Sequence, residues 1–236
     1  MDQSFYIGAV GASQQMQRMT VQGNNIANVN TYGYKAEKAR FTALFYQNMA
    51  AIEEETVPYG VGTRVLTTAT DHAQGGVADT GRAQDYMIAG NGFFALQDLE
   101  TGEISYTRNG SFKVNDIQRD GRQVWMLTDG EGRLVLGSDG APIEVDDVEA
   151  RYDVGIFDYG NYDGMRHLNS TRMLPVDKNG ELLRGEGTLL QNTLELSNVD
   201  LADELTKVIE TQRAYGIALK IVQTSDEIET TINNLR

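Results

Sequence analysis

Only a few segments of the chain have residue types and a spacing that could support chemistry. Residues 90–95 read GNGFFA and satisfy the G-x-G-x-x-[GA] pattern of dinucleotide-binding turns. That pattern binds a pyrophosphate when a helix follows the turn, because the N-terminus of the helix attracts the anion. The apolar run at 93–96 predicts a strand here instead. The sequence therefore argues against a nucleotide cofactor.

The histidines and acidic residues also lack the spacing of a catalytic or metal site. His72 and His167 stand apart, without the H-x-x-x-H or H-E-x-x-H pairing of metal-binding helices. The run at 158–164 has Gly160 and Tyr162 where calcium ligands belong. The acids within 146–149 could pair as general acid and base, although such acids usually form an exposed loop. We therefore expect no enzyme activity, no cofactor, no metal and no small-molecule substrate.

The composition excludes further classes of protein. The 236 residues include 20 Lys and Arg against 34 Asp and Glu, which gives a net charge of −14. This balance argues against nucleic acid or an anionic membrane as partner, because both bind basic surfaces. Zero cysteines exclude disulfides, a thiol nucleophile and cysteine-bound metals. The chain has no apolar stretch of roughly 18 residues that could span a membrane, and its first residues do not resemble a secretory signal.

Two predicted helices at the ends of the chain must carry any interaction surface. Apolar and small residues recur at alternating spacings of four and three from Phe5 to Ile26, and Gln, Arg and Thr fill the positions between them. This spacing predicts a helix with a narrow seam, as in coiled coils. Asn and Gly residues within 28–33 predict its end.

The same spacing recurs from Leu201 to Val222 and continues to Leu235 after a small drift. It predicts a second helix of about 35 residues, with Asn198 or Asp200 as N-cap. A helix of that length with a narrow seam needs a partner helix. Two interpretations remain open, namely a hairpin of the two helices packed on the middle of the chain and an oligomeric bundle built from the ends of many chains.

The middle of the chain alternates short apolar strands with turn dipeptides. The predicted strands are 86–89, 93–97, 104–108, 111–114, 124–128, 134–136, 143–145 and 154–157, with a return through 188–196. Asn-Gly and Asp-Gly pairs at 109, 120, 129 and 139 supply the positive φ angles that hairpins require. Residues 159–179 are predicted as loops. The predicted fold is α+β, with a coiled-coil-like helix pair and a mostly antiparallel central domain that forms a meander or small barrel.

The predicted domains are a helical core from 1–35 and 197–236, an extended connector at 36–80 and a β-rich outer domain at 81–196. The helical core is discontinuous in sequence because it joins the two ends of the chain. Glycine and proline concentrate between residues 51 and 190, which separates the turn-rich middle from the ends.

Two terminal motifs resemble those of bacterial flagellar rod and hook proteins. Residues 24–35 read NNIANVNTYGYK, close to the N-terminal signature N-N-[IL]-A-N-x-x-T-x-G-[FY]-K. Residues 197–205 read SNVDLADEL and residues 209–215 read IETQRAY, close to the C-terminal signature of the same family. The segments GNGFF at 90–94 and YTRNGSF at 106–112 also resemble the family, whereas Asn192 stands where a Gly is usual.

This resemblance implies a structural subunit of the flagellar basal-body rod. Such proteins leave the cell through the flagellar type III export apparatus without signal cleavage, and they polymerise with copies of themselves and with other rod and hook proteins. Their terminal helices form an inner tube in the basal body. The chain is short for the family, which favours a rod protein over the alternative of a hook or hook-junction subunit.

Three groups of residues are predicted to contact neighbouring subunits. The N-terminal motif contributes Asn24, Asn25, Ala27, Asn28, Thr31, Gly33 and Tyr34. The helix seams contribute Phe5, Met16, Met19, Ile26, Leu201, Leu205, Val208, Tyr215, Leu219 and Val222, and the C-terminal motif contributes Ser197, Asn198, Glu204, Gln212 and Arg213. Arg213 is either a donor to an acid such as Glu204 on another chain or a simple surface arginine. The polar N-terminal motif could alternatively only cap its helix.

Overall fold

The computed structural model describes residues 3–43, 46–50, 56–60, 63–119, 122–147 and 150–235. The chain forms two compact units. The first contains Met1–Ala27, Glu37–Ala69 and Asp200–Arg236, and the second contains Asn28–Ala36 and Thr70–Val199. The predicted connector at 36–80 is thus divided between the units, and the predicted domain boundaries stay a prediction. The fold is α+β, as the sequence predicts.

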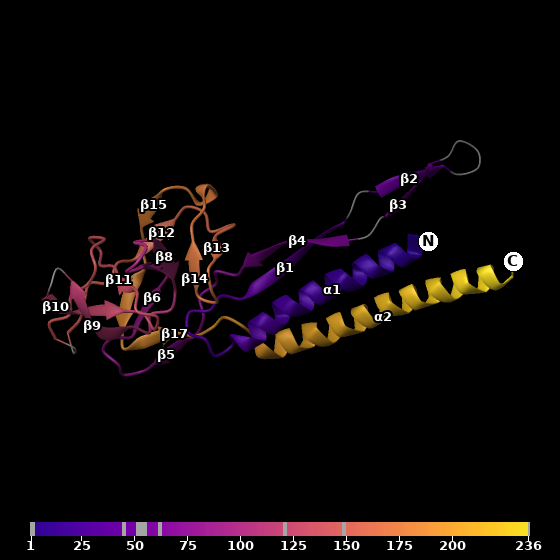
Figure 1. Cartoon of the computed structure of the whole chain (residues 1–236). Coiled ribbons are helices and arrows are strands. Elements are labelled where there is room, and N and C mark those ends of the chain that lie inside the picture. The colour runs from indigo at the N-terminus through magenta and orange to yellow at the C-terminus, as the bar shows by residue number, and fades with distance from the viewer. Residues whose placement is uncertain are drawn as a thin grey trace. The chain divides into compact units, whose positions relative to one another are not determined.

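Two long helices dominate the first unit and lie side by side (Figure 1). Helix α1 runs from Gln3 to Ala27 and ends where the predicted Asn- and Gly-rich segment begins. Helix α2 runs from Leu201 to Asn234. Asp200 is its N-cap, because the Asp200 carboxylate accepts hydrogen bonds from the backbone N–H groups of Ala202 and Asp203. Asn198, the other candidate cap, binds backbone groups of the second unit instead.

The first unit also contains two pairs of strands. Strands β1 (Glu37–Ala43) and β4 (Thr63–Thr70) form one pair. Strands β2 (Tyr46–Ala50) and β3 (Thr56–Gly60) form the other, which is antiparallel. The predicted connector is therefore strand-rich in the part that the structure describes.

The second unit is built on a seven-stranded sheet in the order β13-β14-β8-β7-β11-β10-β9. Its defined pairings are antiparallel. The strands are β7 (Phe94–Gln97), β8 (Ile104–Thr107), β9 (Lys113–Arg119), β10 (Arg122–Thr128), β11 (Leu134–Val135), β13 (Arg166–His167) and β14 (Arg172–Leu174). The order departs from a simple meander because β9 follows β8 in the chain but lies at the opposite edge, beyond β11 and β10, and because β14 and β13 extend the sheet beside β8.

Smaller antiparallel pairs complete the second unit. They are β12 (Phe157–Tyr159) with β15 (Leu182–Arg184), β16 (Thr188–Gln191) with β6 (Tyr86–Ala89), and β17 (Thr193–Glu195) with β5 (Val77–Asp79). A 3₁₀ turn spans Asp177–Asn179. The prediction of loops over 159–179 was therefore wrong for β13 and β14. Strands of two and three residues are too short to show an alternating pattern, and pairing with β8 defines them.

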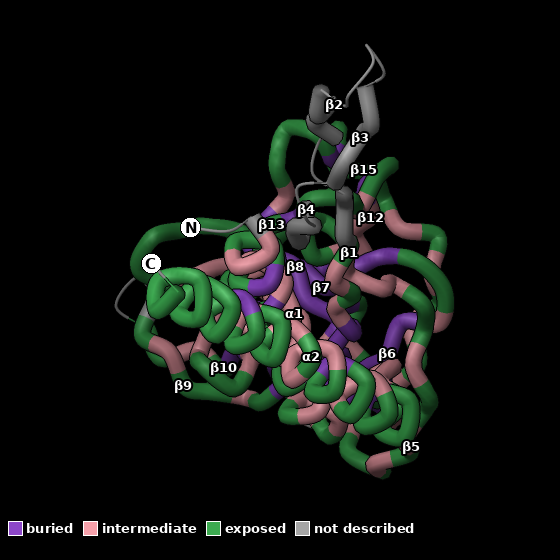
Figure 2. Tube along the Cα trace, turned by 90° about the vertical axis from the view of Figure 1, so that its right-hand side faces the viewer, coloured by how far each residue is buried: buried purple, intermediate pink, exposed green. Residues whose placement is uncertain are grey.

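The core of the second unit lies on both sides of β7. Phe94 and Leu96 belong to one buried cluster, whereas Phe93 and Ala95 belong to another. Successive side chains of a strand point to opposite faces, so a strand buried on both faces reads as a continuous apolar run. This burial explains why residues 93–96 form a strand and not the helix of a nucleotide-binding turn. Figure 2 shows buried residues concentrated in β6, β7 and β8.

Two of the predicted turn glycines do not use a left-handed backbone. Gly110 and Gly130 are absent from the residues with positive φ, whereas Gly140 has φ of 77°. After Asp129 the left-handed residue is Gly132, and the Asp129 carboxylate accepts hydrogen bonds from the backbone N–H groups of Glu131 and Arg133. The side chain of the aspartate thus shapes this turn. The Asp-Gly pair at 120–121 lies outside the described residues.

Asn192 adopts the conformation that the usual glycine would adopt. Its φ is 65°, and among the described residues it is the non-glycine with a positive φ. Its backbone N–H donates to Asp85 O at 2.8 Å, and its carbonyl accepts from the N–H of Thr80 at 2.9 Å. Asparagine tolerates this conformation better than other side chains because it can hydrogen-bond locally.

We expect Asn192→Val to lower the free energy of unfolding by about 1–2 kcal/mol, because a β-branched residue is strained at this φ. Asn192→Gly is the control and should stay within about 0.5 kcal/mol of the parent chain. Urea denaturation followed by circular dichroism measures both. Equal stability of the Val and Gly variants would show that the left-handed turn is not needed.

Candidate subunit interface

Helices α1 and α2 contact each other through small and polar residues. Ser4 Oγ lies 2.8 Å from Ser225 Oγ. A Cβ atom on Gly8 would lie 3.0 Å from Val222 Cγ2 and 3.2 Å from the carbonyl oxygen of Ala218. The helix backbones therefore approach closely here, since interaxial distance depends on the size of the side chains at the contact.

On each helix, most of the residues that make this contact are displaced by about one sequence position from the predicted seam. The buried residues of α2 are Glu204, Thr211 and Ser225. The predicted seam residues Val208, Tyr215 and Val222 are half-buried, whereas Leu205 is 48% exposed and Met16 of α1 is 58% exposed. Large side chains between the helices would hold the backbones apart, so the pair closes on smaller residues. The predicted role of the seams in subunit contacts stays a prediction.

Large apolar side chains are left on the surface of α2, where they spread over more than half of the helix circumference. We call this set of residues the exposed apolar face of α2. They are Leu201, Leu205, Ile209, Ile217, Leu219, Ile221, Ile228 and Ile232, each between 38 and 61% exposed. Figure 2 shows most of α2 as exposed. The α1 helix adds Tyr6, Ile7 and Met16. A helix of a monomeric soluble protein directs such residues inward, and larger apolar patches mark interaction sites.

The N-terminal motif forms the turn after α1. Asn25 is buried and pairs with the backbone of Glu37, because its Nδ2 donates to the Glu37 carbonyl at 2.8 Å and its Oδ1 accepts from the Glu37 N–H at 2.9 Å. The Thr31 hydroxyl donates to Asn28 Oδ1 at 3.2 Å. Phe5, Met19 and Ile26 are half-buried, and Asn24 and Ala27 are exposed. The motif therefore has a defined role within the chain, and its contacts to neighbours stay a prediction.

Gly33 and Tyr34 carry this turn into the core of the second unit. Gly33 has φ of 67°, and its N–H donates to the carbonyl of Glu195 at 2.8 Å. A Cβ atom on Gly33 would lie 2.4 Å from backbone atoms of Arg108 and Asn109. Tyr34 is buried. The glycine thus permits both the left-handed backbone and the close approach of two chain segments.

Three buried charged residues, Lys35, Arg108 and Glu195, contact one another, and we call them the charge cluster. Each of them lies in or beside a motif of the sequence. Lys35 Nζ lies 2.7 Å from Glu195 Oε1, and Arg108 Nη1 lies 3.4 Å from Glu195 Oε2. Lys35 also donates to the carbonyl of Ala73 at 2.8 Å, and Arg108 Nη2 donates to the carbonyl of Gly90 at 2.7 Å. The side chains of all three residues are at most 5% exposed.

The electrostatics of the charge cluster favour a fixed structure. Burial lowers the pKa of Lys35 below its usual value, and the neighbouring Glu195 carboxylate opposes that shift. Burial likewise lowers the pKa of Arg108, again against Glu195. Arg108 also stacks 5.5 Å from the ring centroid of Phe93. One carboxylate thus pairs with two buried cations and is their shared counter-charge, which makes the cluster sensitive to loss of that carboxylate.

The charge cluster was not predicted from the sequence. Lys35, Arg108 and Glu195 each lie in or beside a motif, but up to 160 residues separate them. Charged residues in apolar segments are the signal that could have identified them, because such residues are buried only when they are paired.

The C-terminal motif spans the segment before α2 and the first part of this helix. Asn198 Oδ1 accepts from the N–H of Ala36 at 2.7 Å, and its Nδ2 donates to the carbonyl of Asp71 at 2.8 Å. Ser197 Oγ accepts from the N–H of Val199 at 3.3 Å. Along the helix Glu204 is buried, whereas Gln212 and Arg213 are exposed. The structure therefore separates this motif into residues that bind within the chain and residues on the surface.

His72 is partly buried against the aromatic rings of Phe93 and Tyr162. Burial, together with the charges of Lys35, His167 and Arg108, lowers the pKa of His72 to about 4. The folded chain therefore keeps this imidazole neutral, whereas the unfolded chain protonates it at a pH of about 6.5.

We expect the stability of the second unit to fall as the pH decreases from about 6.5 to about 4, because protonation favours the unfolded chain. A shift of this size corresponds to at most about 3 kcal/mol, and partial exposure reduces that to about 1–2 kcal/mol. Urea denaturation at both pH values should show a smaller pH effect in His72→Gln than in the parent chain. An unchanged pH effect in His72→Gln would contradict the assignment.

The described part of the chain contains no group of three or more His, Cys, Asp and Glu residues that could hold a metal ion. None of the helices in that part is long and apolar enough to cross a membrane. An open groove of about 410 Å³ is lined by Asp158 and Glu186, but Asp158 Oδ1 accepts from the Tyr162 hydroxyl and Glu186 is exposed.

Family models match three segments of the chain. A model described as flagella basal body rod protein matches residues 5–35. One described as flagellar hook protein FlgE/F/G D1 domain matches residues 87–160, and one described as flagellar basal body rod FlgEFG protein C-terminal matches residues 190–235. Together these matches cover α1 and its following turn, much of the β unit, and α2.

Whole-chain comparisons agree with these matches. The chain is 31% identical to the flagellar basal-body rod protein FlgG of Bacillus subtilis (strain 168), and the comparison covers 100% of both chains. It is 30% identical to FlgG of Buchnera aphidicola subsp. Baizongia pistaciae, over 95% of this chain and 96% of that protein. The flagellar hook protein FlgE of Borreliella burgdorferi is 34% identical to this chain, but the comparison covers only 58% of this chain and 34% of the hook protein.

Terminal helices that flank a β unit in the order of the chain, with these matches in the same places, define an axial structural protein of the bacterial flagellum. Within that class the chain belongs to the flagellar basal-body rod protein family. It is a structural subunit of the rod in the flagellar basal body. The hook alternative is weaker, because the hook protein aligns over only part of both chains.

Proposed function

We propose that this rod subunit polymerises through the exposed apolar face of α2, together with the exposed apolar residues of α1. The observation that carries this proposal is the exposure of eight large apolar side chains along one helix. Full burial of one such side chain contributes about 1.5–3 kcal/mol, so a few of them suffice to hold neighbouring subunits. The partners are copies of this chain and other axial flagellar proteins.

The experiment introduces charge into this face. We expect the double variant Ile209→Lys, Ile217→Lys to need at least tenfold more protein to sediment as assemblies than the parent chain, because a lysine cannot be buried there unpaired. Leu99→Lys is a matched control, because Leu99 of the second unit and Ile209 are both 52% exposed. Circular dichroism verifies that the helices remain. Assembly of the double variant at parental concentrations would overturn the proposal.

The proposed function also gives each of the three predicted domains a role. The residues 1–35 and 197–236 act as the axial core, 36–80 connect, and 81–196 form the outer part of the subunit. The net charge supports this assignment, since 24 acidic residues against 12 basic ones lie in 51–190. We expect the terminal helices to exchange amide hydrogens faster in the isolated monomer than in assemblies.

The proposed route to the basal body is the flagellar type III export apparatus, and the proposed role is not enzymatic. Family membership supports both, and the absence of cysteine from the chain is compatible with export of an unfolded polypeptide. Cells with an inactivated flagellar export apparatus should retain the protein in the cytoplasm. Equal amounts outside the cytoplasm in both strains would contradict this route.

A further inference from the structure

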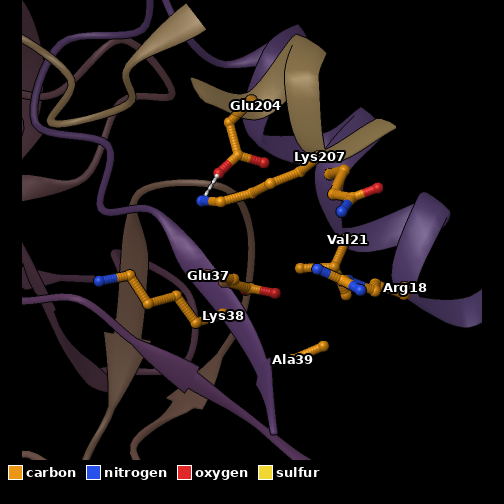
Figure 3. A pocket seen from close by; sticks show the side chains of 8 residues that line it. Arg18, Val21, Glu37, Lys38, Ala39, Glu204 and Lys207 are labelled. Carbon is orange, nitrogen blue, oxygen red and sulfur yellow. Dashed lines mark hydrogen bonds and ion pairs between the residues drawn. The ribbon is translucent and has the colours of Figure 1, made fainter. Parts of the chain in front are cut away.

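A pocket of about 210 Å³ opens in the first unit between α1, β1 and α2 (Figure 3). Its charged and polar lining comprises Arg18 and Gln22 of α1, Glu37 and Lys38 of β1, and Glu204 and Lys207 of α2. Side chains from three different elements of the chain thus converge on one small volume.

Two buried acceptor atoms in this pocket have no hydrogen-bond partner within the described part of the chain. They are Gln22 Oε1 and Glu204 Oε2. Gln22 is 4% exposed, and the side chain of Glu204 is 7% exposed. The other carboxylate oxygen of Glu204 accepts from Lys207 at 2.9 Å. A buried acceptor without a partner costs about 1–3 kcal/mol, so the pocket favours a ligand that donates two hydrogen bonds.

Acidic and basic side chains both line the pocket, so its unpaired acceptors, and not its net charge, define the ligand that it favours. The carboxylates of Glu37 and Glu204 face it, and Asp203 lies 2.6 Å from Lys207. Arg18 and Lys207 are the cations that point inward, because Lys38 directs its ammonium group away (Figure 3). Lys207 is already paired with Glu204 Oε1 and with Asp203, which does not line the pocket. The two unpaired acceptors, Gln22 Oε1 and Glu204 Oε2, remain to be satisfied. A guanidinium group fits this demand, since its planar fork donates to two acceptors at once.

Helix α2 carries such a donor, Arg213, on the side opposite to Glu204. Arg213 follows Glu204 by nine residues, which at about 100° per residue is half a turn away around α2. Ile209 and Ile217 lie one turn before and one turn after Arg213, and both belong to the exposed apolar face. Association through this face therefore removes Arg213 from water and requires a partner for its charge.

We infer that Arg213 of a second copy of this chain inserts into the pocket and donates hydrogen bonds to Glu204 and Gln22. The donor and the acceptors lie on opposite faces of one helix, so the same contact repeats from subunit to subunit without closing into a symmetric dimer. This inference rests on the proposed function and specifies the register of the contact.

Cross-linking tests the register, since the natural chain has no cysteine. Full-length Ala39→Cys protein, with its thiol at the pocket, is mixed with Arg213→Cys protein and treated with a short bis-maleimide. We expect cross-linked pairs at least tenfold in excess of those formed with Lys220→Cys. Lys220 is the matched control because it is exposed and lies two turns from Arg213 on the same side of α2.

A double-mutant cycle tests the interaction itself by sedimentation of the full-length chain. Arg213→Gln and Glu204→Gln should each raise the protein concentration needed for assembly at least tenfold, and the double variant should be no worse than either alone. Lys220→Gln should change that concentration less than threefold. Urea denaturation verifies that each variant folds.

The outcomes separate this inference from the proposed function. Normal assembly of Arg213→Gln, additive effects in the cycle, or equal cross-linking through Lys220→Cys would overturn the inference, whereas polymerisation through α2 would stand. Parental assembly by the Ile209→Lys, Ile217→Lys variant would overturn both.

Discussion

Replacing Glu195 by alanine should lower the free energy of unfolding by about 3–5 kcal/mol, because it leaves Lys35 and Arg108 buried beside each other without a counter-charge. The variant also removes an acceptor for the backbone N–H of Gly75, which lies 2.9 Å from Glu195 Oε1. Urea denaturation, followed by the fluorescence of Trp125 in the second unit, measures the loss.

A matched control removes an acid from an exposed ion pair. Asp203 lies 2.6 Å from Lys207 but is 58% exposed, so Asp203→Ala should cost less than about 1 kcal/mol. A second variant, Glu195→Gln, keeps the shape of the side chain while removing its charge, and should also be strongly destabilised. If Glu195→Ala were no less stable than Asp203→Ala, the charge cluster would not organise the core.

Substituting Gly33 by alanine is expected to cost about 3 kcal/mol or more. The Cβ atom would lie 2.4 Å from backbone atoms of Arg108 and Asn109, and these atoms cannot move without displacing the charge cluster. The φ of 67° adds a backbone penalty of about 1–2 kcal/mol.

Gly102 separates these two costs, because its φ is 69° and a Cβ atom there would meet no other atom within 4 Å. Gly102→Ala should therefore show the backbone penalty alone. Thermal and urea denaturation of both variants give the comparison. Equal losses for Gly33→Ala and Gly102→Ala would mean that the close approach of the two segments at Gly33 contributes nothing.

The long elements of this fold could be predicted because their pattern is local. The spacing from Phe5 to Ile26 and from Leu201 to Val222 predicted α1 and α2, and Asp200 was one of two predicted caps. The face of each helix that meets the other could not be predicted to the residue. Ser4 meets Ser225, and Gly8 lies against Val222, so one predicted seam residue takes part in the contact. No hydrophobic pattern marks the small and polar residues that make the rest of it.

Features that depend on contacts between distant segments could not be predicted from the sequence. Strands β13 and β14 contain two and three residues, and only their pairing beside β8 makes them strands. The Lys35–Glu195 pair joins residues 160 positions apart, so no local spacing indicates it. Asn192 gave a clearer signal, because an asparagine in place of the usual glycine fits the left-handed backbone that the structure has there.

Thiol labelling shows whether α2 uses its exposed apolar face for assembly. Ile209→Cys and Leu99→Cys proteins start with residues of equal exposure, and a maleimide should label both rapidly in dilute monomer. After assembly, we expect labelling at 209 to slow at least tenfold while labelling at 99 slows less. Unchanged labelling at 209 in sedimented assemblies would contradict the account.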